Sequence, residues 1–66
     1  MSVRATIQDV RNAGYCASGA RRWFEAYDLN FRAFLSDGID AEILRGTGDA
    51  LGIRVANVAE ERMTDG

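Results

Sequence analysis

The side chains that could carry out covalent chemistry in this chain are carboxylates, hydroxyls and one thiol. The chain has no histidine, and all eight of its basic residues are arginine. A serine or cysteine nucleophile needs a neighbouring base, and with neither histidine nor lysine the usual base is missing. A chain of 66 residues also rarely encloses a pocket that excludes water from a reaction. We therefore expect no enzyme, although the candidates for such chemistry include Ser18, Ser36, Cys16, Tyr15 and Tyr27.

Neighbouring carboxylates are the other source of acid–base or metal chemistry. Asp37 lies near Asp40, and Asp40 near Glu42. Both pairs fall at expected helix ends, where capping of the helix already accounts for an acidic side chain. Histidine is the commonest metal ligand in proteins, so its absence argues against a zinc site. The sequence predicts neither a metal nor a cofactor.

A glycine-rich stretch, "RGTGDALG", has some likeness to a phosphate-binding loop. A dinucleotide loop needs the spacing G-x-G-x-x-G after a buried strand, whereas Gly46, Gly48 and Gly52 follow G-x-G-x-x-x-G after a helical pattern. Asp49 would also place a carboxylate where a phosphate should bind. The stretch is better explained as a joint between two helices.

Apolar residues recur three and four positions apart along the chain, and no stretch alternates with a period of two, which predicts helices only. We expect an all-α fold, a single compact domain over residues 1–66 with about five short helices. The first is expected at Ile7–Ala13, the fourth at Ala41–Arg45 and the last at Asp49–Met63. The expected N-caps, in chain order, are Thr6 with Asp9 in a capping box, Ser18, Asn30, Asp40, and Thr47 or Asp49.

The expected core follows from the apolar face of each helix. In the second helix the spacing i, i+3, i+4 and i+7 gives one continuous apolar stripe. A single cysteine permits no disulfide within the chain, and Cys16 in its apolar neighbourhood is expected to be a small core residue. The inward-facing residues are expected to be Ile7, Val10, Ala20, Trp23, Phe24, Tyr27, Phe31, Phe34, Leu35, Leu51, Val55 and Val58.

The last helix carries a row of small residues, Gly52, Ala56 and Ala59, beside its apolar stripe. A glycine inside a helix costs about 1 kcal/mol relative to alanine, so the close approach of another backbone should compensate. The favoured interpretation is packing within one chain, against the second helix, because a domain of this size needs its packing internally. The alternative is a homodimer through the same row.

Charge is divided unevenly along the chain, whose net charge is −2. Residues 1–33 hold five arginines and three acids, which gives +2, and residues 34–66 hold three arginines and seven acids, which gives −4. Such segregation can steer an encounter with a charged partner. No segment has the length and apolarity of a membrane span, so no membrane association is expected.

Residues 7–29, "IQDVRNAGYCASGARRWFEAYDL", resemble the helix-turn-helix half of MerR-type and excisionase-type winged-helix proteins. The matching positions are Gly14, Arg22, Trp23, Phe24, Glu25 and Leu29. The resemblance implies that Arg21 and Arg22, with Arg11 beside them, would contact phosphates or bases. The rest of the chain departs from those families, because it has no β-hairpin wing and its second half is acidic.

The whole chain is also similar to small proteins encoded by tailed phages and prophages of proteobacteria. The residues that carry this similarity are "V-x-x-A-G-x-C" (10–16), "G-A-R-x-W-F" (19–24), "L-N-F-x-x-F" (29–34), "G-I" (38–39) and "T-G-D-A" (47–50). The resemblance implies a non-enzymatic phage product located in the host cytoplasm or in the virion. It would be a virion or assembly component, or an inhibitor of a host defence system such as an anti-CRISPR protein.

These observations favour a protein that works by binding another protein. The expected contact residues are exposed groups that neither cap a helix nor fill the core: Arg21, Arg22 and Glu25 on the second helix, and Ile53, Asn57, Glu60 and Glu61 on the last. One alternative is a helix-turn-helix regulator that binds DNA, although few outward arginines and a negative net charge make nucleic acid a poor partner. The other is an acidic mimic of nucleic acid that presents Asp37, Asp40, Glu42 and Asp49.

Overall fold

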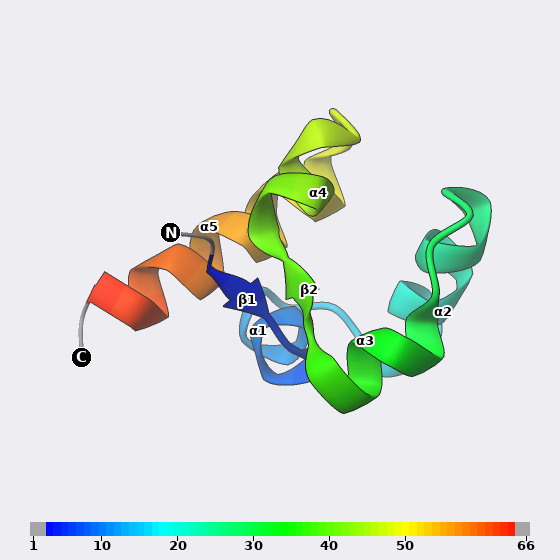
Figure 1. The fold of residues 1–66 in the computed structure, drawn as a ribbon, viewed down its shortest axis with the longest axis horizontal. Helices are drawn as coiled ribbons and strands as arrows, with labels where there is room; N and C mark the ends of the chain where they lie inside the picture. The colour runs from blue at the N-terminus through cyan, green and yellow to red at the C-terminus, as the bar shows by residue number, and fades with distance from the viewer. Residues whose placement is uncertain (1–2, 65–66) are drawn as a thin grey trace.

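The computed structural model describes residues 3–64, which form five short helices and one small sheet. In chain order they are β1 (Arg4–Ala5), α1 (Ile7–Asn12), α2 (Ala17–Ala26), α3 (Phe31–Asp37), β2 (Ile39–Asp40), α4 (Ala41–Gly46) and α5 (Ala50–Thr64) (Figure 1). The expected all-α fold class with about five short helices is confirmed.

The expectation of helices only was wrong at one place, where β1 and β2 pair antiparallel with Arg4 opposite Asp40 and Ala5 opposite Ile39. Two-residue strands are too short to show an alternating pattern, so the sequence carries no signal for them. Gly38 makes the pairing possible. Its φ of 76° turns the chain out of α3, and a Cβ there would lie 2.7 Å from the carbonyl oxygen of Ala5.

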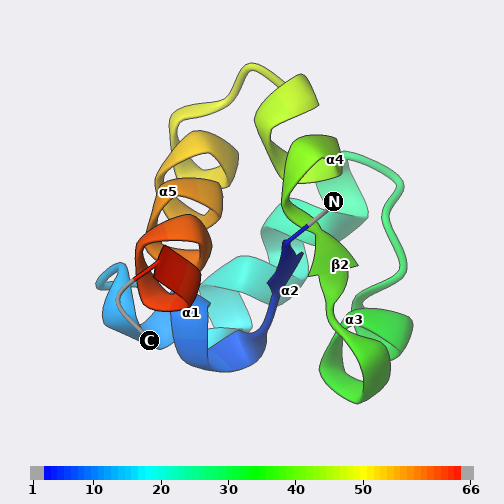
Figure 2. The same ribbon diagram turned by 60° about the vertical axis from the view of Figure 1, so that its left-hand side comes forward.

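The helices form two groups around the sheet. α5 packs along α4 and α1, while α3 packs against α2 on the other side of the molecule (Figures 1 and 2). α1 also contacts α2 and thereby joins the two groups. Because each helix is only two to four turns long, each contributes few residues to the shared core.

Aromatic rings of α2 and α3 fill the core between those two helices. The ring of Phe24 lies 4.6 Å from Phe34 and 5.3 Å from Phe31, measured between centroids. Phe24 and Phe34 are buried, as expected, but Leu35 is 51% exposed and Tyr27 40% exposed. The prediction that Leu35 faces the core was wrong, because a helix of two turns that buries Phe34 turns the next residue about 100° away from it.

The row of small residues on α5 is packed inside the chain. Gly52, Ala56 and Ala59 are all buried. A Cβ on Gly52 would overlap the carbonyl oxygen of Leu44 in α4 and lie 3.1 Å from the ring of Trp23. The packing is therefore within the chain, as favoured, but the close backbone neighbour is α4 rather than the expected second helix, α2, which contributes the ring of Trp23. The row offers no surface to a second copy, so the alternative of a homodimer through it was wrong.

Most expected caps are present, with one exception at α2. Asn30 accepts a hydrogen bond from the Ala33 N–H at 3.0 Å, and Asp40 accepts one from the Glu42 N–H at 2.9 Å. α2 begins earlier than expected, because Cys16 rather than Ser18 is its N-cap. The Cys16 sulfur accepts from the Gly19 N–H at 3.4 Å and is exposed. The expected burial of this thiol was wrong, since a capping side chain lies at the surface end of its helix.

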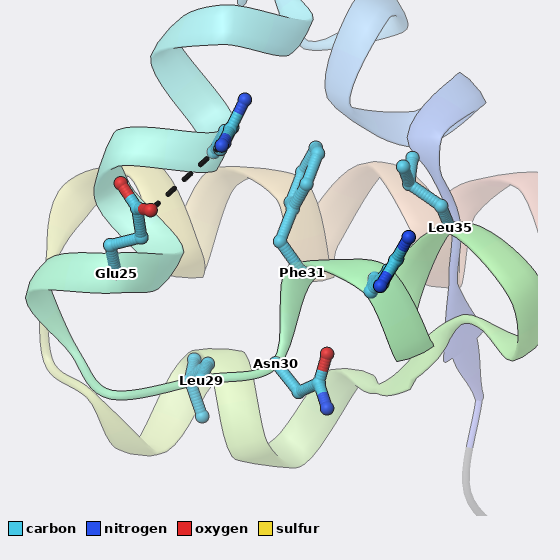
Figure 3. Close-up of a pocket in the computed structure, with 7 residues that line it drawn as sticks. Glu25, Leu29, Asn30, Phe31 and Leu35 are labelled. Atoms are coloured by element: carbon cyan, nitrogen blue, oxygen red, sulfur yellow. Dashed lines mark ion pairs between the residues drawn. The ribbon is translucent and has the colours of Figure 1, made fainter.

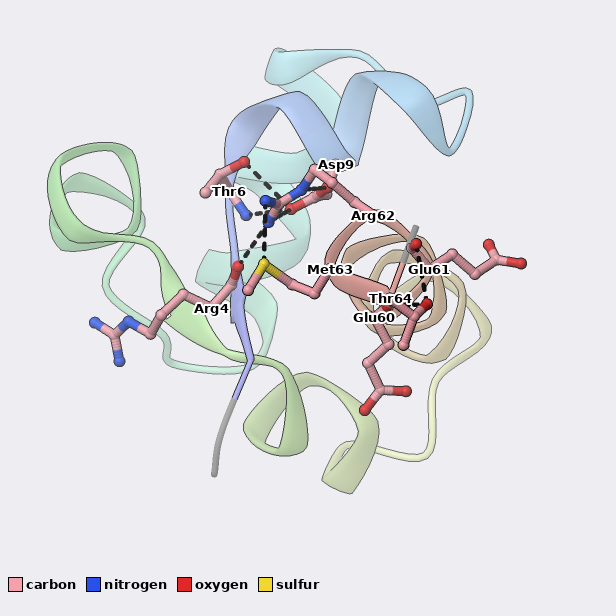
Figure 4. A network of polar contacts seen from close by, with 8 residues as sticks. All are labelled: Arg4, Thr6, Asp9, Glu60, Glu61, Arg62, Met63 and Thr64. Carbon is pink, nitrogen blue, oxygen red and sulfur yellow. Dashed lines mark hydrogen bonds and ion pairs between the residues drawn. The ribbon is translucent and has the colours of Figure 1, made fainter. Parts of the chain in front are cut away.

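Asp9, the acidic residue of the capping box at α1, forms an ion pair that the sequence did not predict. Asp9 is fully buried, and its carboxylate accepts hydrogen bonds from the Thr6 N–H at 2.8 Å and from the Thr6 hydroxyl at 3.2 Å. Arg62, in the last turn of α5, donates to the same carboxylate at 2.8 and 3.1 Å. Arg62 also donates to the carbonyl oxygen of Arg4 at 3.0 Å. One ion pair thus joins β1, α1 and α5 (Figure 4).

Burial by itself raises the pKa of Asp9. The hydrogen bond from Arg62, the hydrogen bonds from Thr6 and the positive charge of Arg62 outweigh that effect, so the pKa lies below its ordinary value. A buried carboxylate with this many donors is ionised in the folded protein.

Asp9→Asn should lower the free energy of unfolding at pH 7 by about 2 kcal/mol, because Arg62 loses its ionic partner. The loss is smaller than for a wholly buried pair, since the Arg62 side chain is 41% exposed and can reach water. Urea denaturation measures the change. Glu61→Gln, at an exposed position of α5 next to Arg62, is the matched control and should leave the free energy of unfolding unchanged.

The same variant has a defined pH dependence. The folded pKa of Asp9 lies below its unfolded value, so its contribution is complete above about pH 5 and is lost as the pH falls through the folded pKa. The difference in stability between the wild type and Asp9→Asn should therefore stay constant from neutral pH down to about pH 5 and shrink below that. A difference that grows on acidification would contradict the assignment.

Gly52→Ala should destabilise the protein by about 2 kcal/mol, because the overlap with the Leu44 carbonyl oxygen outweighs the gain in helix propensity. Gly46→Ala is the control, since a Cβ at this helical position meets nothing within 4 Å. It should leave the stability unchanged or raise it by up to about 1 kcal/mol. Equal stability of the two variants in urea would show that the close contact at Gly52 is absent.

Candidate protein-binding groove

The expected contact residues lie in two separate places. Arg21, Arg22 and Glu25 are exposed on α2. The other four lie on α5, which packs mainly against α4 and α1. The structure therefore does not bring the seven residues together into one site.

Two of the four residues on α5 have a structural role instead. Arg45 of α4 donates to Asn57 at 2.6 Å and to the two carboxylate oxygens of Glu60 at 3.1 and 2.7 Å. The same guanidinium pairs with Glu42 at 2.9 Å. Asn57 and Glu60 thus fasten α5 to α4, and their role as partner contacts stays a prediction. No local pattern predicted these bonds, because Arg45 lies twelve positions from Asn57 and fifteen from Glu60.

Ile53 and Glu61 remain exposed, as expected. Ile53 is 37% exposed, and within residues 3–64 the carboxylate of Glu61 makes no hydrogen bond or ion pair. Glu61 points away from the Asp9 pair (Figure 4). Neither residue lines the groove between α2 and α3 that is described next.

A groove does lie beside the contact residues of α2. It runs between α2 and α3 and encloses about 580 Å³. Figure 3 shows Phe31 and Leu35 on α3, with Glu25 on α2 across from them and Leu29 and Asn30 in the connection. Its full lining is Arg21, Glu25, Leu29, Asn30, Phe31, Arg32 and Leu35.

The local sequence explains why both helices reach this groove. Asp28 adopts a positive φ of 59° and reverses the chain directly after α2. The Leu29 N–H then donates to the carbonyl oxygen of Phe24 at 2.8 Å, and Asn30 caps the next helix. A turn this tight places the first residue of α3, Phe31, beside the last turns of α2.

Arginines without a strong ion-pair partner give the groove its positive charge. Arg21 and Glu25 are 4.0 Å apart and well exposed, so their ion pair is weak. Arg32, and Arg22 beside the groove, make no side-chain hydrogen bond or ion pair with any residue from 3 to 64. These guanidinium groups are free to bind an external acceptor.

Sequence reasoning found two of the groove residues, Arg21 and Glu25, and missed the other five. Phe31 and Leu35 were assigned to the core by their spacing. Positions 31, 34 and 35 fall on one face of a helix, so the sequence carried no signal that Leu35 would be exposed. Nothing in the sequence marked Arg32 as a groove residue.

The acidic residues proposed for nucleic-acid mimicry are mostly engaged within the chain. Asp40 caps α4, and Glu42 pairs with Arg45. Asp49 caps α5 through the Leu51 N–H at 3.0 Å and accepts from the Tyr27 hydroxyl at 2.8 Å. The Leu51 and Tyr27 hydrogen bonds hold the pKa of Asp49 below its ordinary value, and the bond to Asp49 raises the pKa of Tyr27. Asp37 is exposed.

Within residues 3–64 no three histidine, cysteine or acidic side chains gather closely enough to hold a metal ion. No helix in this part of the chain combines the length and apolarity needed to span a membrane. The groove itself presents guanidinium groups and apolar side chains.

Comparisons with known proteins add no relative to this description. No family model matches the chain, and searches of curated proteins and of solved structures found no significant match. The groove must therefore be interpreted from its own residues.

Glu60→Ala should lower the Tm by a few degrees, because Arg45 loses the carboxylate that joins α4 to α5. Glu61→Ala, one position along the same helix, should leave the Tm unchanged. Thermal unfolding followed by circular dichroism at low salt compares the two. If both variants melted alike, the bridging role assigned to Glu60 would be wrong.

Proposed function

We propose that this protein acts without catalysis, by binding another protein through the groove between α2 and α3. The observation that carries the proposal is the half-exposed Leu35 beside the unpaired guanidinium of Arg32. Arginine and aromatic side chains are enriched at the centres of protein interfaces. Phe31 adds an aromatic ring to the same groove, which is open rather than enclosed as a catalytic pocket would be.

The resemblance to small phage proteins supports a more specific proposal. The protein would be a virion or assembly component, or an inhibitor of a host defence system such as an anti-CRISPR protein. In either role it would function in the host cytoplasm or in the virion, and its target would be a host or phage protein. A small, helical, non-catalytic binding module suits both roles.

A helix-turn-helix regulator is the second candidate. The connection between α1 and α2 is four residues long and contains Gly14 with a φ of 94°, as such a turn requires. Arg11, Arg21 and Arg22 are exposed around it. However, duplex binding depends on neutralising several phosphates at once, and three arginines beside Glu25 and Asp28 supply little positive charge.

The acidic mimic is a third, weaker candidate. A mimic needs a row of carboxylates free to face a nucleic-acid-binding site. Three of the four proposed acids are held by contacts within the chain, so the row would be incomplete.

A pair of experiments separates the first two candidates. In a mobility-shift titration at low salt we expect no complex with a mixed-sequence DNA duplex up to about micromolar protein, the range of non-specific binding. Tight binding that disappears on Arg21→Ala with Arg22→Ala would favour the DNA-binding regulator instead.

The complementary experiment places a photo-crosslinking amino acid at position 35 in the groove or at position 61 on α5, and exposes each variant to host or phage lysate. We expect a discrete crosslinked protein from position 35 and none from position 61. Leu35 is exposed, so its replacement should leave the fold intact. Crosslinking from position 61 alone would move the binding surface to α5.

A further inference from the structure

The groove between α2 and α3 has an apolar centre with positive charge on both sides. Phe31 and Leu35 are four residues apart on α3 and therefore lie on one face of that helix. Arg32 stands beside them on the same helix, and Arg21 faces them from α2. Glu25 is the single acid among the seven lining residues, so the lining has a net charge of +1.

The arginines of this protein divide into two kinds, and those of the groove are the free kind. Arg45 and Arg62 are fully engaged in ion pairs that fasten α5, and Arg54 donates to the Ala13 carbonyl oxygen at 2.9 Å. Arg32 has no partner of this kind, and Arg21 has only a contact of 4.0 Å. A carboxylate brought by a partner would therefore displace no strong internal bond.

The groove also carries free hydrogen-bond donors for a peptide backbone. Asn30 uses its side-chain oxygen to cap α3, accepting from the Ala33 N–H at 3.0 Å. The amide N–H groups of Asn30 are left to donate to a carbonyl oxygen. An arginine offers two parallel N–H groups that match a carboxylate in a bidentate pair.

Building on the proposed function, we propose that the groove binds a short acidic segment of a partner protein. An apolar side chain of that segment lies between Phe31 and Leu35, and a neighbouring carboxylate pairs with Arg32, with Arg21 as a second site for negative charge. Nucleic acid fits this groove poorly, because a phosphate backbone makes no use of the apolar centre and two arginines neutralise few phosphates.

The test uses the full chain, immobilised and exposed to a display library of random peptides of about twelve residues, a length that can lie along a groove between two short helices. We expect the enriched peptides to combine an apolar residue with glutamate or aspartate nearby. The best of them is synthesised with a fluorescent label, and its Kd is measured by anisotropy.

Charge reversal in the groove should then weaken binding selectively. Arg32→Glu should raise the Kd of the selected peptide at least about tenfold, as should replacing the acids of the peptide by their amides. Arg11→Glu reverses an exposed arginine of α1 outside the groove and should change the Kd by less than about twofold. Replacing the acids of the peptide by lysine should restore binding to Arg32→Glu. Circular dichroism confirms that both variants fold.

The remaining outcomes distinguish this inference from the proposed function. Peptides that are neutral or basic, yet lose binding on Leu35→Glu, would overturn the acidic partner while leaving the groove as a protein-binding site. Enriched peptides that bind equally to Arg32→Glu and Leu35→Glu, or no enrichment at all, would overturn both proposals. A DNA duplex that displaces the peptide and binds more tightly would assign the surface to nucleic acid.

Discussion

The buried ion pair between Asp9 and Arg62 connects the two ends of the described chain. The two residues are 53 positions apart, and the carboxylate is fully buried while it caps α1. Because the chain has one cysteine, no disulfide within it can hold the ends together, and the core of so small a domain is limited. A buried pair adds specificity to such a core, since only one arrangement of α1 and α5 gives Asp9 its donors.

Arginine has two distinct roles in this molecule, and they occupy different regions. Arg45, Arg54 and Arg62 attach α5 to its neighbours through carboxylates and a backbone carbonyl oxygen. The arginines of α2 and α3 are largely free. The acidic excess of the second half is thus partly neutralised internally, whereas the positive charge of the first half remains available at the surface.

The candidate groove is a consequence of short elements. α3 is only seven residues long and follows α2 after a tight turn at Asp28. It can bury Phe34 against Phe24 but leaves Leu35 half exposed and Phe31 only partly covered. A longer helix, or a sixth one packed across α2 and α3, would cover this apolar surface. Within residues 3–64 this apolar surface stays exposed beside the guanidinium groups of Arg21 and Arg32.

The sequence by itself determined the fold class, most helix boundaries and caps, and the packing of Gly52 within the chain, because these depend on local spacing and on single residues such as Asn30 and Asp40. It also identified the exposed charges of α2 that border the groove. Only the tertiary structure decided the partners of Arg45 and Arg62, the pairing of β1 with β2, and which apolar residues of α3 stay at the surface. Those features depend on which segments meet across long separations in the chain, and a carboxylate or an apolar side chain has the same local pattern whether or not it finds such a neighbour.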